Sequence, residues 1–129
     1  MIGQHFNISK YNWDINIFYD VDKRDISFCI KTLNKYTKRK HFHKECIDTL
    51  GEGIKDRAYV YTAYDKESTV LFISPYSSTG EFLSTIAHEA NHIKSHIATY
   101  YDLNEKDEEV CYIIGTIVKE MSNVFMAII

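Results

Sequence analysis

Three segments of the chain have the composition and spacing of β-strands. Ile15, Ile17 and Tyr19 occupy every second position of the first segment, which places them on one face of a strand. The other two segments are rich in tyrosine and β-branched residues, and only the polar residues 65–68 separate them. The pattern therefore predicts one strand and, later in the chain, a hairpin. The expected strands are residues 13–21, 59–64 and 69–73.

Apolar residues that recur at three- and four-residue steps predict four helices. Two short helices are expected at residues 25–36 and 41–50. A longer helix is expected to begin after Ser78, which forms the pattern of a capping box with Glu81. A turn at residues 102–104 then leads into the fourth helix. Its apolar positions are Val110, Ile113, Ile114, Ile117, Val118 and Met121.

Composition and charge describe one ordinary α+β domain. The 129 residues are 45% hydrophobic and 26% charged, so we expect residues 1–129 to bury a single modest core. A net charge of -3 and a pI of about 6.0 give no reason to expect nucleic acid as a partner. We find neither a basic and apolar leader nor an apolar run near the roughly 18 residues of a membrane span. We therefore expect no membrane partner and a cytoplasmic protein.

Cysteine usage agrees with a reducing compartment. Cys29, Cys46 and Cys111 are odd in number and widely spaced, and each lies among apolar neighbours. This pattern is typical of reduced, buried thiols rather than disulfides.

Residues 38–44, Lys-Arg-Lys-His-Phe-His-Lys, form a dense basic run. Such a run could hold phosphate, nucleic acid or an acidic partner, but isolated charge runs usually face solvent, and we expect a solvated loop. His41 and His43 lie two positions apart, a spacing that suits no shared helix face, so they are poor candidates for metal ligands.

The last six residues, 124–129, are apolar on every side. Such an end must pack into the core or meet another copy of the protein. We therefore hypothesise from the sequence that the protein forms a homodimer through its last helix.

The third helix holds the candidate metal-binding and catalytic residues, because it contains the His-Glu-x-x-His signature of helical zinc sites. His88 and His92 lie four residues apart on one helix face, so both imidazoles can reach a single ion. Glu89 lies one position on, close enough to take a proton from the metal-bound water but turned too far to be a first-choice ligand. The motif predicts His88 and His92 as zinc ligands and Glu89 as the catalytic base.

A catalytic zinc site also needs a third protein ligand and an open position for water. The longer metzincin pattern requires Gly at position 95 and His at position 98, and this chain has Ser95 and Ala98, which excludes that class. A carboxylate from the fourth helix remains. The short connection should pack the two helices antiparallel and bring the acidic cluster at residues 105–109 back toward His92.

Glu108 is our choice for the third ligand. Tyr112 and Gly115 follow it at i+4 and i+7, so one stripe would present a ligand, a phenol and a position of close approach. Glu109 is the alternative, and Glu105 and Asp102 are less favoured. Acidic residues in a first turn also complement the helix dipole, a role that is compatible with binding metal.

Residues 82–92 (Phe-Leu-Ser-Thr-Ile-Ala-His-Glu-Ala-Asn-His), followed by residues 108–115 (Glu-Glu-Val-Cys-Tyr-Ile-Ile-Gly), resemble the small zinc peptidases of gut Bacteroides-type phages and related mobile elements. Those are similar to minimal gluzincins, in which a HExxH helix precedes an E-x-x-A-Y-L-x-G helix. Here Cys111 stands in place of Ala, and the likeness extends to residues 6–11. The resemblance implies a zincin-like α+β fold, with a small antiparallel or mixed sheet packed on the zinc helix and the glutamate helix. It also implies Zn²⁺ as the cofactor and places the ligand Glu on Glu108.

The leading functional hypothesis is a zinc-dependent peptidase of the gluzincin type, with a peptide or protein as its substrate. Tyr112 is the expected donor to the developing oxyanion, and His96 and Tyr76 are alternatives. A second hypothesis is a non-catalytic zinc-binding or interaction protein on the same scaffold. The small size of the chain favours it, whereas Glu89, which metal binding alone does not need, opposes it. The third and least favoured hypothesis is a purely structural helix pair with solvated histidines.

Overall fold

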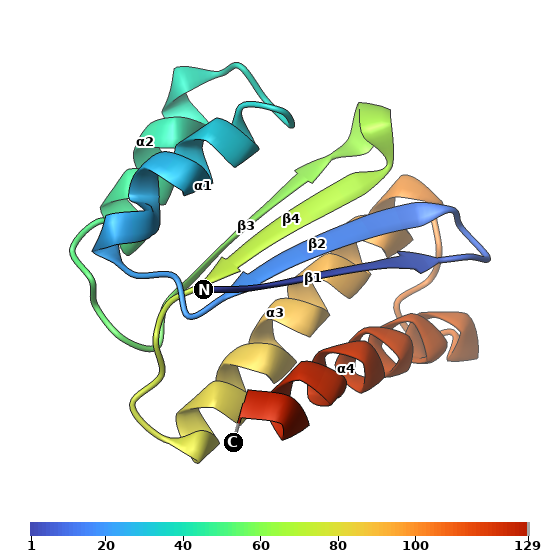
Figure 1. The fold of residues 1–129 in the computed structure, drawn as a ribbon. Helices are drawn as coiled ribbons and strands as arrows, with labels where there is room; N and C mark the ends of the chain where they lie inside the picture. Colours follow the sequence, from blue (N-terminus) through green and yellow to red (C-terminus); the bar gives the residue numbers. More distant parts are fainter. Residues whose placement is uncertain (129) are drawn as a thin grey trace.

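The structure, a computed structural model, describes residues 1–128 and is an α+β fold. In this part of the chain, four strands form one mixed sheet, with two helices on each of its faces (Figure 1). The helices α1 (Ile26–Leu33) and α2 (Lys40–Leu50) cover one face. The longer α3 (Thr79–Tyr100) and α4 (Glu108–Ile128) cover the other. The α+β class and the small mixed sheet expected from the sequence are confirmed.

The strands are arranged in the order β1-β2-β4-β3. Their bounds are β1 Ile2–Ile8, β2 Trp13–Tyr19, β3 Ala58–Ala63 and β4 Ser68–Ile73. The hairpins β1–β2 and β3–β4 are antiparallel, and the two hairpins join through the parallel pair β2–β4, in which Ile17 lies opposite Leu71. β1 and β3 are therefore the edge strands. β1 was not among the predicted strands, and β2 ends two residues before the predicted limit.

Helix starts and turns follow the local signals of the chain. The Ser78 side chain accepts a hydrogen bond from the Glu81 backbone N–H at 3.1 Å, which forms half of the predicted capping box. Asp22 caps a short 3-10 turn (Lys23–Asp25) that leads into α1, and the Asp25 carboxylate accepts the reciprocal bond from the Asp22 backbone N–H. A second 3-10 turn, Tyr64–Lys66, closes the β3–β4 hairpin.

Two separate cores lie on the two faces of the sheet. All six residues of β4 are buried, and they alternate between the faces as the pleat requires. Leu71 and Ile73 pack with α3 and α4, whereas Val70 and Phe72 pack with α1 and α2. The α3–α4 core is the larger and also contains Trp13. The site helix α3 is thus fixed by apolar packing along one side and free along the other.

The long helix α4 has the length and composition to cross a membrane, and it is the one such helix among residues 1–128. Its buried residues are Val110, Ile113, Ile117, Met121 and Phe125, and the last four of them belong to the α3–α4 core. Of the apolar chain end, Phe125 is buried and Met126 is exposed, and Ile129 lies outside the described residues.

The predicted burial of the cysteines holds for two of the three. Cys29 and Cys46 are buried between α1, α2 and the sheet. Cys111 is exposed, so the expectation of a buried thiol was wrong there. The reason is its position on α4, one residue past Val110 and outside the stripe that packs into the core.

Candidate metal and catalytic site

The histidine pair of α3 points at one location. His88 and His92 lie on the exposed face of the helix, and their Nε2 atoms are 3.0 Å apart. Two nitrogens bound to one tetrahedral zinc at about 2.0–2.1 Å would lie roughly 3.3 Å apart. The observed separation is close to this value. The helix repeat thus brings two imidazoles into a geometry that fits a shared metal ion.

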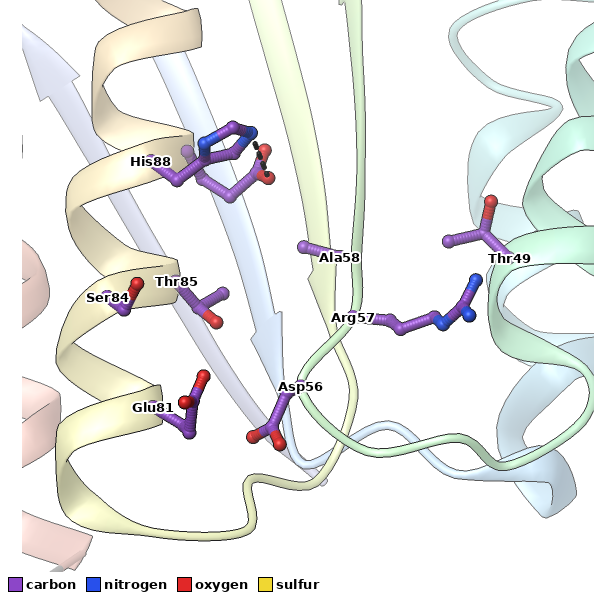
Figure 2. Close-up of a pocket in the computed structure, with 9 residues that line it drawn as sticks. Thr49, Asp56, Arg57, Ala58, Glu81, Ser84, Thr85 and His88 are labelled. Carbon is purple, nitrogen blue, oxygen red and sulfur yellow. Dashed lines mark ion pairs between the residues drawn. The ribbon is translucent and has the colours of Figure 1, made fainter.

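Glu89 is a buried carboxylate beside that pair. Its exposed fraction is 7%, and its Oε1 lies 4.0 Å from His88 Nε2, the ion pair dashed in Figure 2. It makes no hydrogen bond to another residue in the part of the chain that the structure describes. Burial raises the pKa of Glu89, and the nearby imidazoles of His92 and His88 partly oppose this shift. A carboxylate with a raised pKa beside two imidazoles suits proton transfer.

A cleft of about 390 Å³ opens in front of His88 and Glu89. α3 forms one wall, and the segment that leads into β3, together with the end of α2, forms the other (Figure 2). Figure 2 shows Asp56 and Glu81 at the end away from His88, and Arg57 extending toward Thr49 of α2. The cleft walls are polar and carry charges of both signs.

Asp56 is the most firmly held residue of the cleft. Its backbone has a φ of 61°, in the left-handed region, and its N–H donates to the Pro75 carbonyl oxygen at 2.9 Å. Its side chain accepts hydrogen bonds from the hydroxyl and backbone N–H of Ser77, and these bonds lower the pKa of Asp56. The loop that enters β3 is thus tied to the loop that enters α3, which fixes the width of the cleft at this end.

His96 extends the histidine stripe by one turn but is bound to the sheet. Its Nδ1 lies 2.7 Å from Thr62 Oγ1, which in turn lies 2.8 Å from Thr69 Oγ1. Thr69 also accepts a hydrogen bond from the Trp13 indole at 3.0 Å. Burial, followed by the charge of His92, lowers the pKa of His96. This chain of contacts anchors α3 to the sheet one turn beyond the metal-ligand pair.

The two tyrosines considered as oxyanion donors lie apart from the pair. Tyr76 stacks on Phe82 with ring centroids 4.8 Å apart, near the start of α3. Tyr112 has an exposed fraction of 60% and lines surface hollows of α4. Of the three donors suggested by the sequence, His96 alone continues the stripe of His88 and His92.

The acidic residues at and just before the start of α4 were expected near His92, but they contact other residues. Glu109 accepts hydrogen bonds from Lys10, at 2.8 Å, and from the Tyr11 hydroxyl. Glu105 pairs with Lys94 at 2.7 Å. Glu108 lines a surface hollow with Lys10, Glu109 and Tyr112. Within residues 1–128, the structure does not bring three His, Cys, Asp or Glu side chains together in a group that could hold a metal.

The geometry of α3 explains this separation. Lys94 lies about 240° around the helix from His88, so its partner Glu105 approaches the opposite flank of α3. The histidine flank faces β3, through Thr62 and the cleft, whereas α4 contacts β1. The antiparallel return of α4 therefore brings its first turn to the side of α3 away from the imidazoles.

Sequence reasoning placed one strand of residues 57–74 beside the cleft but did not single out Asp56 and Arg57. They line the opposite wall from the segment just before β3, which is held by hydrogen bonds of Asp56 with Pro75 and Ser77 and of Arg57 with Ser74. The one local signal was the polar stretch before the strand, which is common in surface loops. The contacts of Glu109 with Lys10 and Tyr11 likewise could not be predicted from spacing along the chain.

Comparisons with known proteins add no further assignment. No family model matches the chain, and neither a curated protein nor a solved structure matches it. The site is therefore interpreted from the His88, Glu89 and His92 geometry and from the cleft in front of it.

Proposed function

We propose that the chain is a zinc-dependent peptidase of the gluzincin type on a zincin-like fold, acting in the cytoplasm. The observation that carries the proposal is the 3.0 Å separation of His88 Nε2 and His92 Nε2, close to what tetrahedral zinc requires. When bound there, zinc would supply Lewis-acid chemistry and make water more acidic. His88 and His92 would hold the ion, and Glu89 would accept the proton from the attacking water and return it to the leaving amine.

The cleft supports a peptide as the substrate. β3 is an edge strand, so the backbone groups on its outer side have no neighbouring strand to pair with. An extended peptide can add to such an edge by main-chain hydrogen bonds. Ala58, the first residue of β3, lies in the same cleft as His88 and Glu89. A peptide bound along the start of β3 would therefore pass in front of the proposed base.

Glu108 is the proposed third ligand, and it requires the first turn of α4 to move toward the histidine flank. Recruiting Glu109 instead would break its contacts with Lys10 and Tyr11, whereas Glu108 makes no hydrogen bond among the described residues. Ligand binding that orders or moves a segment is a common part of metal-site assembly. Tyr112, one turn after Glu108, would move with it and could then donate to a substrate oxygen.

The separate position of Glu108 also favours a second candidate function. A non-catalytic zinc-binding or interaction protein would need only part of the ligand set, and two imidazoles with solvent ligands would serve it. The burial of Glu89 favours the peptidase, since burying an ionisable side chain costs free energy without benefit to metal binding.

Replacement of Glu89 separates the two functions. We expect Glu89→Gln to keep one zinc per chain and to lose hydrolysis of a mixed peptide library by about 10²-fold or more, since the variant cannot accept the proton. Metal analysis and mass spectrometry of the library measure the two effects. A zinc-loaded wild type as inert as the variant would favour the binding protein. Wild-type protein that takes up no zinc would overturn both candidates.

A further inference from the structure

Charge is divided between the two faces of the sheet. Residues 23–57, which include α1 and α2, contain ten Lys or Arg and five Asp or Glu, a net charge of +5. The rest of the chain contains five Lys or Arg and thirteen Asp or Glu, a net charge of -8. Helices α1 and α2 cover one face of the sheet and α3 and α4 the other (Figure 1). The segment that covers the α1–α2 face, which we call the basic face, is therefore positive, whereas the rest of the chain is negative.

The basic face carries a surface groove of about 640 Å³ between α1 and α2. Ile26 and Ile30 of α1 line it together with Ile47 of α2, and Ile47 has an exposed fraction of 46%. These positions form a second apolar stripe, because Cys29, Leu33, Cys46 and Leu50 already fill the core beneath. Apolar side chains left at the surface in a concave groove are typical of a binding site.

Cations border this apolar floor. Lys31 and Lys40 line the groove, and neither forms an ion pair within the described part of the chain. His43 also lines the groove, with its Nε2 3.0 Å from the Thr37 carbonyl oxygen. No acidic residue is among those that line the groove. The groove therefore combines apolar contact with a positive rim and no competing carboxylate.

We propose that this groove, the α1–α2 groove, binds an acidic peptide segment that also carries aliphatic or aromatic side chains. The apolar side chains would enter between Ile30 and Ile47, and carboxylates beside them would pair with Lys31 and Lys40. A nucleic acid backbone is charged but has no apolar group that could pack against the isoleucines. The proposal is independent of zinc, because the groove lies on the opposite face of the sheet from the histidine pair.

Binding of three short fluorescein-labelled peptides to the full chain tests the proposal by fluorescence anisotropy. The peptides consist of Glu and Leu, of Glu and Ser, and of Lys and Leu. We expect the Glu–Leu peptide to bind most tightly and to weaken with added salt, because both the apolar floor and the rim contribute. The double variant Lys31→Glu/Lys40→Glu should weaken it by about tenfold or more, and Ile47→Ser by a smaller factor.

The matched control is Lys119→Glu, which reverses a lysine of α4 on the other face and should leave Glu–Leu binding unchanged. Circular dichroism of each variant verifies that it is folded. Equal binding by wild type and both groove variants would overturn the proposal, as would failure of the Glu–Leu peptide to bind. Binding of phosphatidylserine vesicles that depends on Lys31 and Lys40, without peptide binding, would assign the groove to lipid and would also overturn it.

Discussion

Glu89 is the predicted catalytic base and Glu109 the alternative third ligand, and the structure gives these two carboxylates opposite surroundings. Glu89 is buried, has no hydrogen-bonding partner among residues 1–128, and lies 4.0 Å from an imidazole nitrogen. Glu109 is half-buried at the start of α4 and is held by Lys10 and Tyr11. The contrast shows that spacing within one helix determines geometry, whereas spacing between helices leaves their relative rotation open.

The strongest test of the α3 side removes one imidazole. We expect His92→Ala to reduce zinc content from one per chain to near zero, because a single imidazole with solvent ligands binds zinc weakly at neutral pH. Metal analysis after dialysis measures the effect. His41→Ala, which removes an exposed imidazole of α2, is the matched control and should keep its zinc. Full zinc content in the His92 variant would contradict the shared site.

A second prediction addresses the α4 side. If Glu108 completes the site, Glu108→Gln should weaken zinc binding by about tenfold or more, and Glu109→Gln should change it little. Competition with a chelating dye measures both affinities. The reverse order would assign the ligand to Glu109 and would mean that its contacts with Lys10 and Tyr11 break on metal binding.

Cys111 offers a second readout of the same prediction. It is exposed and lies three residues after Glu108, whereas Cys29 and Cys46 are buried and burial raises their pKa values to about 12. A thiol reagent should therefore modify Cys111 first. Zinc should slow this reaction in the wild type and not in Glu108→Gln. An equal rate with and without zinc would show that the first turn of α4 stays in place.

The smallest expected effect is on stability, and it has opposite signs at the two carboxylates. Burial raises the pKa of Glu89, so its contribution to the free energy of unfolding is greatest in acid and is lost as the pH rises through the raised pKa. Hydrogen bonds from Lys10 and then Tyr11 lower the pKa of Glu109, so its contribution exists above the ordinary carboxyl range and is lost as the pH falls.

Urea unfolding of the metal-free protein between about pH 4 and pH 7 measures both contributions. Glu89→Gln should be more stable than wild type at neutral pH and close to it in acid. Glu109→Gln should be slightly less stable at neutral pH and also converge in acid. Parallel pH profiles for both variants would contradict the difference between the two environments.

Local patterns predicted the four helices and every strand except β1, whereas non-local contacts decided the site. The alternation at Ile15, Ile17 and Tyr19 and the Ser78 cap depend on neighbours within a few residues, and both appear in the structure. The parallel pairing of β2 with β4 depends on residues far apart in the chain. Spacing along the chain carries no information on such contacts, nor on those of Asp56 with Pro75 and Ser77, so Asp56 could not be singled out as a residue of the cleft wall.

The exposure of Cys111 and the position of Glu108 depend on the rotation of α4 about its own axis, which the sequence does not determine. A shift of one residue in the packed stripe turns a helix by about 100°, enough to exchange a facing side chain for an exposed one. The apolar residues of α4 are numerous enough to allow several stripes, and the structure uses Val110, Ile113 and Ile117. The exposed position of Cys111 follows directly from that stripe.

The parallel joining of the two hairpins has a consequence for how the protein assembles. Helices form from neighbouring residues on fast timescales, whereas Ile17 and Leu71 can meet only after a long loop closes. The turn that carries His88 and His92 would accordingly form before the complete sheet exists for α3 to pack on, and therefore before the cleft between α3 and β3. During folding, the capacity to capture an ion would precede the capacity to select a substrate.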